Sequence, residues 1–180
     1  MENIRNELPP QINQFFSKLS NYINEKLYFY GSVQRKDYIS NNSDIDVCIF
    51  TDNVHTVNNK LLHFLHLHKK SIKKIMWTAH PSHRIVYGYK LKYTHANPEF
   101  KLEVAVYNDK YKHDILIQHN LKNDLPFYTV FVLTILKYIY YYLNLISKKN
   151  YSYYKNKIMN YSLGHPDNNL VIISPNFQMD

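Results

Sequence analysis

Two aspartates separated by one residue are the side chains of this chain best placed to do chemistry. Asp44 and Asp46 flank Ile45 in a segment whose apolar residues continue to Ile49. Because side chains alternate along an extended strand, both carboxylates are predicted to lie on one face and the isoleucines on the other. Two adjacent negative charges repel each other, and a divalent cation between them relieves that repulsion. Ligands that are all oxygen favour Mg²⁺ or Mn²⁺ over zinc, so the pattern indicates metal-assisted chemistry.

A glycine-serine pair upstream of the aspartates indicates an anion site. Residues 26–30 have the aromatic and apolar composition of a strand, and Gly31 at its end can adopt backbone angles that other residues avoid. Ser32 is predicted to open a short helical turn, whose backbone N–H groups and serine hydroxyl are typical phosphate donors. Arg35 follows closely, and its planar guanidinium suits the same anion. The two patterns together predict metal-assisted transfer on a nucleotide.

The pair Gly31-Ser32, with Arg35 and the segment 44–47, resembles the signature of the DNA polymerase β-like nucleotidyltransferase superfamily. That signature is Gly-(Gly/Ser), a spacer of about ten residues, and then Asp-apolar-(Asp/Glu)-apolar. The resemblance covers roughly residues 27–107 and implies a mixed sheet. It also implies transfer of a nucleoside monophosphate from a nucleoside triphosphate with two metal ions, Mg²⁺ or Mn²⁺, about 4 Å apart.

The resemblance implies roles for individual residues. Asp44 and Asp46 would hold the metal ions and act in catalysis. The nucleotide-binding residues that it implies are Gly31, Ser32, Arg35, Ser43 and, on a later helix, Lys137.

A third carboxylate on a later strand is also implied. Residues 99–107 alternate apolar and other side chains as a half-buried strand does, and Glu103 lies in their middle. Glu103 is therefore the expected third catalytic and metal-binding residue. The family usually has aspartate here, and glutamate is longer by one methylene. An alternative is a solvent-facing strand on which Glu103 pairs with Lys101 or with a lysine of a neighbouring strand.

A long apolar segment at residues 127–146 raises two alternatives. It is long enough for a membrane span, but it contains Lys137, Asn144 and several tyrosines, so a helix buried on most sides is favoured and no membrane is expected. Lys137 resembles the lysine that poly(A) polymerase-like enzymes direct at the triphosphate. A lysine can equally extend along apolar surface to reach water.

The charge of the chain favours an anionic partner. The 22 lysines and arginines exceed the 14 acidic residues, which gives a formal net charge of +8. Such an excess promotes sequence-independent binding to polyanions, although the usage typical of an AT-rich genome also raises the lysine content. Residues 148–157 mix lysine with tyrosine, as single-strand-binding surfaces do, and as a solvated helix end also does.

Several acceptors and two rival classes remain open. The acceptor of the nucleotide could be an RNA or DNA 3′-hydroxyl, a protein hydroxyl or a small molecule, and the basic charge favours a nucleic-acid end. One rival is a catalytically inactive nucleotidyltransferase-like module that binds nucleotide or nucleic acid. The other is a pure interaction protein, in which the motif would be accidental. The single cysteine, Cys48, and the absence of an apolar leader predict a reducing, cytoplasmic location.

The expected fold class is α+β, with a mixed sheet of about five strands, flanking helices and a long C-terminal helix. We expect a nucleotidyltransferase catalytic domain over residues 1–123 and a C-terminal helical segment over 124–180 that packs on it. Helices are expected at residues 9–25, 52–68, 109–120 and from 126, and strands at 26–30, 44–49, 72–78, 84–93 and 99–107.

Overall fold

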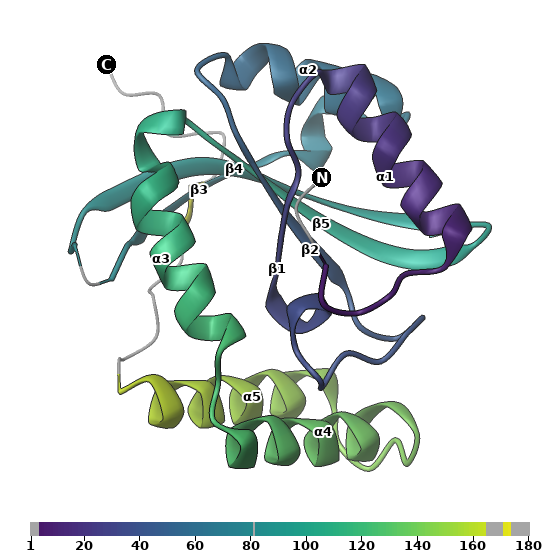
Figure 1. The fold of residues 1–180 in the computed structure, drawn as a ribbon, viewed down its shortest axis with the longest axis vertical. Helices are drawn as coiled ribbons and strands as arrows, with labels where there is room; N and C mark the ends of the chain where they lie inside the picture. The colour runs from purple at the N-terminus through teal and green to yellow at the C-terminus, as the bar shows by residue number, and fades with distance from the viewer. Residues whose placement is uncertain (1–3, 81, 165–170, 174–180) are drawn as a thin grey trace.

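Five α-helices surround a mixed six-stranded sheet in the computed structural model of the chain, which describes residues 4–80, 82–164 and 171–173 (Figure 1). The helices are α1 (Pro10–Ile23), α2 (Val54–Phe64), α3 (Lys112–Asn123), α4 (Phe127–Tyr141) and α5 (Lys148–Leu163). The strands are β1 (Tyr28–Tyr30), β2 (Ile45–Phe50), β3 (Lys73–Thr78), β4 (Ile85–Ala96), β5 (Glu99–Tyr107) and β6 (Val171–Ile173). Short 3₁₀ helices occupy η1 (Gly31–Gln34), η2 (Lys69–Ser71) and η3 (Asp109–Tyr111).

The α+β class and the five expected strands are confirmed, and the sheet contains one strand more. β6 pairs antiparallel with β3 at the sheet edge. The helix expected from residue 126 ends at Tyr141, and a second helix, α5, begins at Lys148. Among the described residues, no helix has the length and hydropathy needed to cross a membrane.

The strand order places two distant parts of the chain side by side. The order is β1-β2-β5-β4-β3-β6, in which β2 and β5 are parallel and the other neighbouring strands are antiparallel. Parallel neighbours need a crossover connection, and here α2, β3 and β4 lie between them in sequence. In the resulting register Asp46 lies opposite Glu103 on one side and opposite Tyr30 on the other.

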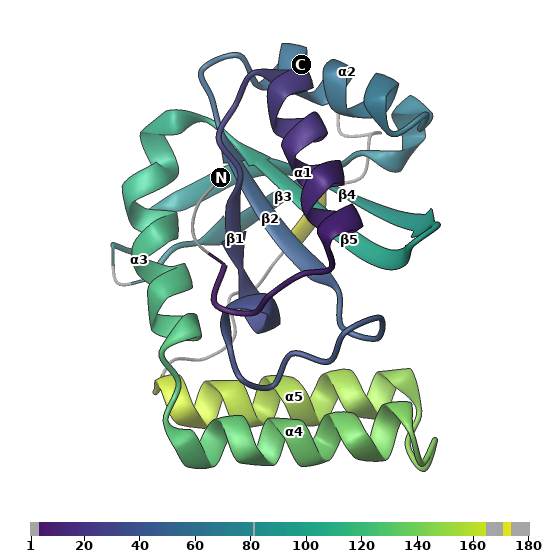
Figure 2. The same cartoon turned by 45° about the vertical axis from the view of Figure 1, so that its right-hand side comes forward.

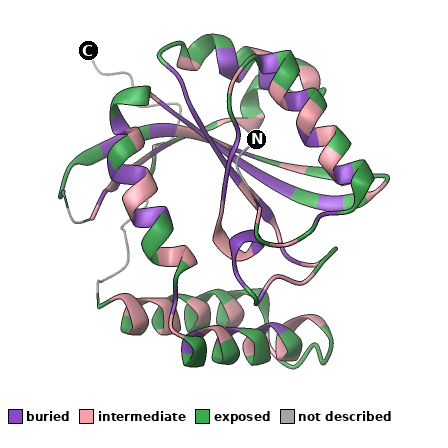
Figure 3. Ribbon diagram, in the orientation of Figure 1, coloured by how far each residue is buried: buried purple, intermediate pink, exposed green. Residues whose placement is uncertain are grey.

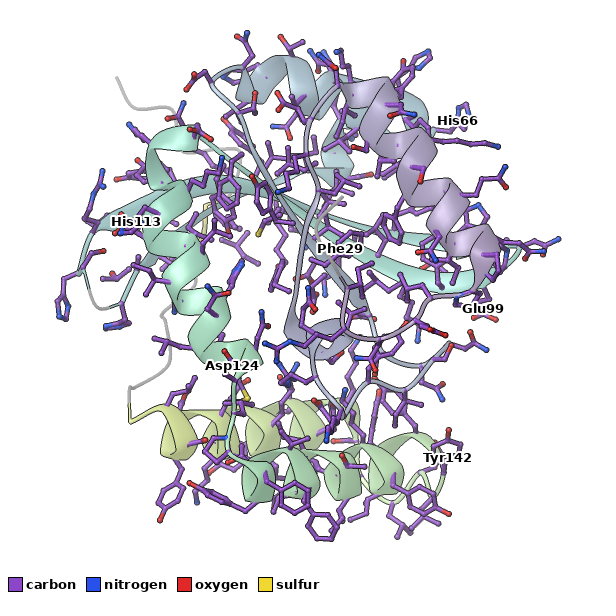
Figure 4. All side chains as sticks on the ribbon, in the orientation of Figure 1. Phe29, His66, Glu99, His113, Asp124 and Tyr142 are labelled. Carbon is purple, nitrogen blue, oxygen red and sulfur yellow. The ribbon has the colours of Figure 1, made fainter. Side chains whose placement is uncertain are left out.

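One face of the sheet packs on α1 and α2. Along β2, the side chains of Ile45, Val47 and Ile49 enter this core, as their alternation with Asp44 and Asp46 predicts. The amphipathic helix α1 contributes its buried stripe: Ile12, Phe16, Leu19 and Ile23. Figure 4 shows Phe29 in the interior beneath this helix, with His66, Glu99 and Tyr142 at the periphery. Figure 3, coloured by burial, shows that the central strands are largely buried and that the outer faces of the helices are exposed.

The opposite face carries a second core and the carboxylates. Part of it is covered by α3, whose Ile115 packs in a cluster with Cys48, Trp77 and Tyr107. The rest of this face, nearer the start of β2, lies toward the α4 and α5 pair. These two helices run side by side and cross the end of the sheet near η1 (Figure 2). Many of their outward side chains are apolar and exposed: Phe127, Tyr128, Phe131, Ile135, Tyr138, Tyr142, Tyr153 and Tyr161.

Candidate active site

Gly31 allows β1 to end against the carboxylate of Asp46. Its φ of +75° lies in the left-handed region, which other residues adopt at a cost. A Cβ atom at this position would also overlap the Asp46 carboxylate, because β1 pairs with β2 and Tyr30 lies opposite Asp46. The glycine is therefore required both by the turn and by the close approach. Ser32 follows in η1, where its carbonyl accepts a hydrogen bond from the Arg35 N–H at 2.9 Å.

Three carboxylates meet where the start of β2 lies beside the middle of β5. Asp44 immediately precedes β2, and Asp46 on β2 lies opposite Glu103 on β5. Burial and the negative charge of Glu103 raise the pKa of Asp46 to about 7, and Asp44 adds to this effect. The positive charges of Lys155 and Lys90 oppose the rise. The structure thus holds Asp46 where its negative charge is poorly compensated.

Glu103 has a different environment from that of Asp46. Lys90 and Lys92, both on β4, form ion pairs with its two carboxylate oxygens, Lys90 with Oε1 and Lys92 with Oε2 at 2.9 Å. Burial by itself raises the pKa of Glu103, but the charges and hydrogen bonds of the two lysines outweigh burial and lower it. The alternative from the sequence is a solvent-facing strand on which Glu103 pairs with a lysine. The structure shows such a pairing, with lysines of β4, but Glu103 itself is buried.

A buried ion cluster joins α4 to the loop between η1 and β2. Asp37 accepts hydrogen bonds from Arg35 at 2.8 and 3.2 Å, and its Oδ2 lies 3.0 Å from Lys137 Nζ. Lys137 also donates to the Asp37 carbonyl at 2.7 Å and to Ser43 Oγ at 3.1 Å. Arg35 donates in addition to the Lys122 carbonyl at 3.3 Å. Three expected nucleotide-binding residues therefore also hold this loop and α4 together.

Asp37 is the member of this cluster that sequence reasoning missed. It has no alternating pattern or motif around it, and its partner on α4 is 100 residues away. Burial alone raises the pKa of Asp37, but its hydrogen bond with Arg35 and the two positive charges lower it. Desolvation lowers the pKa of Lys137, although the negative charge and the hydrogen bond of Asp37 act to raise it.

All eight expected site residues line one cavity of about 830 Å³. They come from η1 and the loop that follows, from β2 and β5, and from α4. The cavity wall also includes residues that the motif did not identify, namely Lys90, Lys92, Lys122, Tyr141, Lys148, Tyr151 and Lys155. Its volume is within the range of natural ligand pockets, roughly 300 to 1,000 Å³. The lysine-tyrosine segment 148–157 thus contributes to the cavity through α5 instead of only covering the surface.

Aromatic side chains form the inner wall of the cavity. The rings of Tyr30 and His119 stack with centroids 4.0 Å apart. Burial lowers the pKa of His119 to about 3, so this ring is neutral at physiological pH. Trp77 donates its indole N–H to the Tyr107 hydroxyl at 3.2 Å. These neutral rings adjoin the charged carboxylates, because Tyr30 lies opposite Asp46 in the β1–β2 register.

Asp44 and Asp46 fit a divalent cation, and Glu103 fits one less well. Burial and the neighbouring carboxylates disfavour the ionised form of Asp46, and a cation beside it would favour that form. The donor atoms of the two aspartates are oxygens, which Mg²⁺ and Mn²⁺ prefer as ligands. Both oxygens of Glu103 are instead paired with lysines. Within residues 4–80, 82–164 and 171–173, no group of three or more His, Cys, Asp or Glu side chains is arranged to hold a metal ion.

Comparison with protein families identifies the domain type of most of the chain. Residues 10–132 match the family model described as the nucleotidyltransferase domain. The matched region begins with α1, contains the whole glycine-serine and aspartate motif and β5, and ends within α4. Searches of curated proteins and of solved structures gave no match. Members of this family typically use divalent metals. The match covers more than half of the chain, which therefore belongs to the nucleotidyltransferase domain family of the polymerase β-like superfamily.

Proposed function

We propose that the protein is a metal-dependent nucleotidyltransferase that moves a nucleoside monophosphate from a nucleoside triphosphate to a hydroxyl group, with a nucleic-acid 3′ end as the acceptor. The observation that carries this proposal is the meeting of Asp46, Glu103 and the Gly31-Ser32 turn at one cavity. Family membership supports the reaction class. The nucleic-acid acceptor is inferred from the positive net charge of the chain.

The triphosphate is proposed to lie against η1. Ser32 supplies a hydroxyl donor there, and the backbone of the turn supplies N–H groups. Arg35, Ser43 and Lys137 form the adjoining wall. Arg35 and Lys137 bind Asp37, and Lys137 also binds Ser43, so these contacts link the loop to α4. Lys148 and Lys155 on α5 face the same cavity and can balance the charge of the departing pyrophosphate.

Asp44 and Asp46 are the proposed metal ligands, with Glu103 as the third carboxylate of the cluster. When bound, the divalent cation would neutralise charge on the triphosphate and favour ionisation of the attacking hydroxyl. The two aspartates would position it beside the Gly31-Ser32 turn, because Gly31 contacts Asp46 directly. A cation between the two aspartates would also offset the burial and the neighbouring negative charges that raise the pKa of Asp46.

A nucleic-acid acceptor agrees with the charge and the aromatic content of the cavity rim. The net charge of +8 favours polyanions, and α5 alternates lysine with tyrosine along the cavity wall. A hydroxyl of a protein or of a small molecule is the alternative acceptor for the same chemistry.

Incubation of the protein with each α-³²P-labelled nucleoside triphosphate, Mg²⁺ or Mn²⁺, and RNA or DNA oligonucleotides tests the proposal. We expect lengthened, labelled oligonucleotides, and we expect Asp44→Asn and Asp46→Asn each to reduce transfer by roughly 100-fold or more. Asp52→Asn is the matched control, since Asp52 is exposed at the other end of β2 and should retain full transfer. Transfer that survives the double Asp44→Asn/Asp46→Asn substitution would refute the proposed site.

One observation favours a second candidate, an inactive module that binds nucleotide or nucleic acid. Both oxygens of Glu103 are occupied by lysines. The same experiment distinguishes the two candidates. Tight nucleotide binding without transfer to any oligonucleotide, protein or small-molecule acceptor would support the inactive module.

A further inference from the structure

We propose that Lys90 and Lys92 replace a metal ion at Glu103, so that the site binds one divalent cation, through Asp44 and Asp46, instead of two. This inference rests on the proposed function and concerns the number of cations that the site accepts. It assigns to two residues of β4 a role that the motif does not contain.

The geometry of the sheet holds both lysines at Glu103. Lys92 lies directly opposite Glu103 in the β4–β5 register, and Lys90 lies two residues earlier on the same face of the strand. Each carboxylate oxygen accepts from a different ammonium group, Oε1 from Lys90 and Oε2 from Lys92. A metal ion could bind Glu103 only after displacing at least one of these groups.

The two lysines differ in how easily they could move away. The Lys92 side chain is 72% exposed and can reach water in other rotamers, whereas that of Lys90 is 25% exposed and belongs to the cavity wall. Lys90 is therefore the more persistent positive charge of the pair and lies on the acidic side of the cavity.

The charges of the three carboxylates support one cation. Two ammonium groups already neutralise Glu103, and a second metal ion would be repelled by both of them. Asp44 and Asp46 have no such pairing in the part of the chain that the structure describes. Three carboxylates and two ammonium groups leave one net negative charge, which a single divalent cation already outweighs, so a second cation would meet a net positive cluster.

Counting bound Mn²⁺ by electron paramagnetic resonance tests this inference without relying on catalysis. The protein is titrated with Mn²⁺ alone and with Mn²⁺ plus α,β-methylene-ATP. We expect one bound ion in the unmodified protein, the same number in Glu103→Gln, and loss of the ion in Asp44→Asn/Asp46→Asn. The variant Lys90→Met/Lys92→Met should bind two ions, and adding Glu103→Gln to it should restore one. Lys70→Met/Lys74→Met removes equal charge from exposed positions outside the cavity and should still bind one ion.

Two results would overturn the inference while leaving the proposed function intact. The first is two ions in the unmodified protein, of which Glu103→Gln removes one. The second is one ion in Lys90→Met/Lys92→Met, with a thermal unfolding curve that shows a folded protein. Absence of bound Mn²⁺ in every variant would instead contradict the proposed metal-dependent function itself. Glu103→Gln keeps the test decisive if the lysine variant does not fold.

Discussion

Asp46 occupies a position in which the ionised form of its side chain is disfavoured. Burial and the charge of Glu103 raise its pKa to about 7, well above the value of about 3.9 typical of an unfolded chain. Glu103, one strand away, has its pKa lowered by two lysines. At the scale of single residues, the site therefore separates a compensated carboxylate from an uncompensated one, which is an arrangement common at functional sites.

The raised pKa predicts that Asp46 makes the metal-free protein less stable as the pH rises. Between about pH 4 and pH 7 the folded protein keeps a proton on Asp46 that the unfolded chain has released, so stability falls with increasing pH in that window and is constant above it. We expect Asp46→Asn to raise the free energy of unfolding by about 2 kcal/mol at about pH 8 and by little at about pH 4.

Urea denaturation at the two pH values measures this difference. Asp109→Asn is the control, because Asp109 is half-exposed in a surface ion pair with Lys112, and its substitution should change stability by less than about 1 kcal/mol. Equal effects of Asp46→Asn at both pH values would show that Asp46 titrates normally.

Gly31 offers a second test at the residue scale, with a matched control in Gly164. Both glycines have positive φ, +75° and +66°, so alanine should cost about 1 kcal/mol of backbone strain at either position. A Cβ at Gly31 would also press on the Asp46 carboxylate, whereas a Cβ at Gly164 meets no atom within 4 Å.

We therefore expect Gly31→Ala to lose more stability than Gly164→Ala and to weaken Mn²⁺ binding roughly tenfold, about 1.4 kcal/mol. Gly164→Ala should leave Mn²⁺ binding unchanged. Thermal unfolding and Mn²⁺ titration measure the two effects. Identical losses of stability and unchanged Mn²⁺ binding in both variants would mean that Gly31 serves only the turn.

At the scale of elements, the position of α4 depends on one buried carboxylate. Asp37 in the loop after η1 binds Arg35 from its own segment and Lys137 from α4. The same loop is closed locally by Ser43, whose hydroxyl accepts the Ile39 N–H at 3.1 Å. The two helices at the end of the sheet are thereby linked to the strand that carries Asp46.

Substitutions in this ion cluster should reduce the free energy of unfolding by different amounts. Asp37→Asn leaves two buried cations without a counter-charge and should cost about 4 kcal/mol of stability, while Lys137→Met leaves Asp37 paired with Arg35 and should cost about 2 kcal/mol. Because the pKa of Asp37 is lowered, its contribution should persist at neutral pH and disappear as the pH falls through that lowered value.

Urea denaturation of the two variants and of Lys157→Met tests the order. Lys157 is an exposed lysine of α5 and does not line the cavity, so its substitution should cost less than about 0.5 kcal/mol. A loss in Lys137→Met no greater than that in Lys157→Met would show that the ion cluster does not hold α4.

At the scale of the whole molecule, positive charge is concentrated where the cavity opens between the sheet and α5. Six lysines line it: Lys90, Lys92, Lys122, Lys137, Lys148 and Lys155. Two of these neutralise Glu103, and those of α5 belong to the lysine-tyrosine segment. The net charge of +8 therefore acts at the candidate site as well as over the general surface.

Binding of a fluorescein-labelled single-stranded RNA should weaken steeply with salt. Each lysine–phosphate contact contributes about 0.7 to the slope of log affinity against log salt for single strands, so Lys148→Met/Lys155→Met should reduce the slope by about 1.4. Fluorescence anisotropy between about 50 and 200 mM salt measures it. The control, Lys18→Met/Lys70→Met, removes two exposed lysines outside the cavity. Equal slopes for the two double variants would place the RNA elsewhere.

Much of the site followed from local periodicity. Alternation along a strand placed Ile45 and Val47 in the core and Asp46 on the other face, and the structure confirms this placement. The left-handed turn at Gly31 is likewise a local property. The strands and the helices up to α3 were predicted well for the same reason, whereas the end of α4 was not, because neither Gly nor Pro interrupts the sequence between Tyr141 and Lys148.

Only the tertiary structure decided which charges neighbour which carboxylates. The parallel pairing of β2 with β5 brings Glu103 beside Asp46, and the pairing of β4 with β5 brings two lysines to Glu103. Lys137 reaches Asp37 across 100 residues because α4 crosses the end of the sheet. Spacing along a chain specifies which face of an element a side chain occupies. Strand order and helix packing depend on the burial of whole faces, so they alone set the contacts that define the charge of this site.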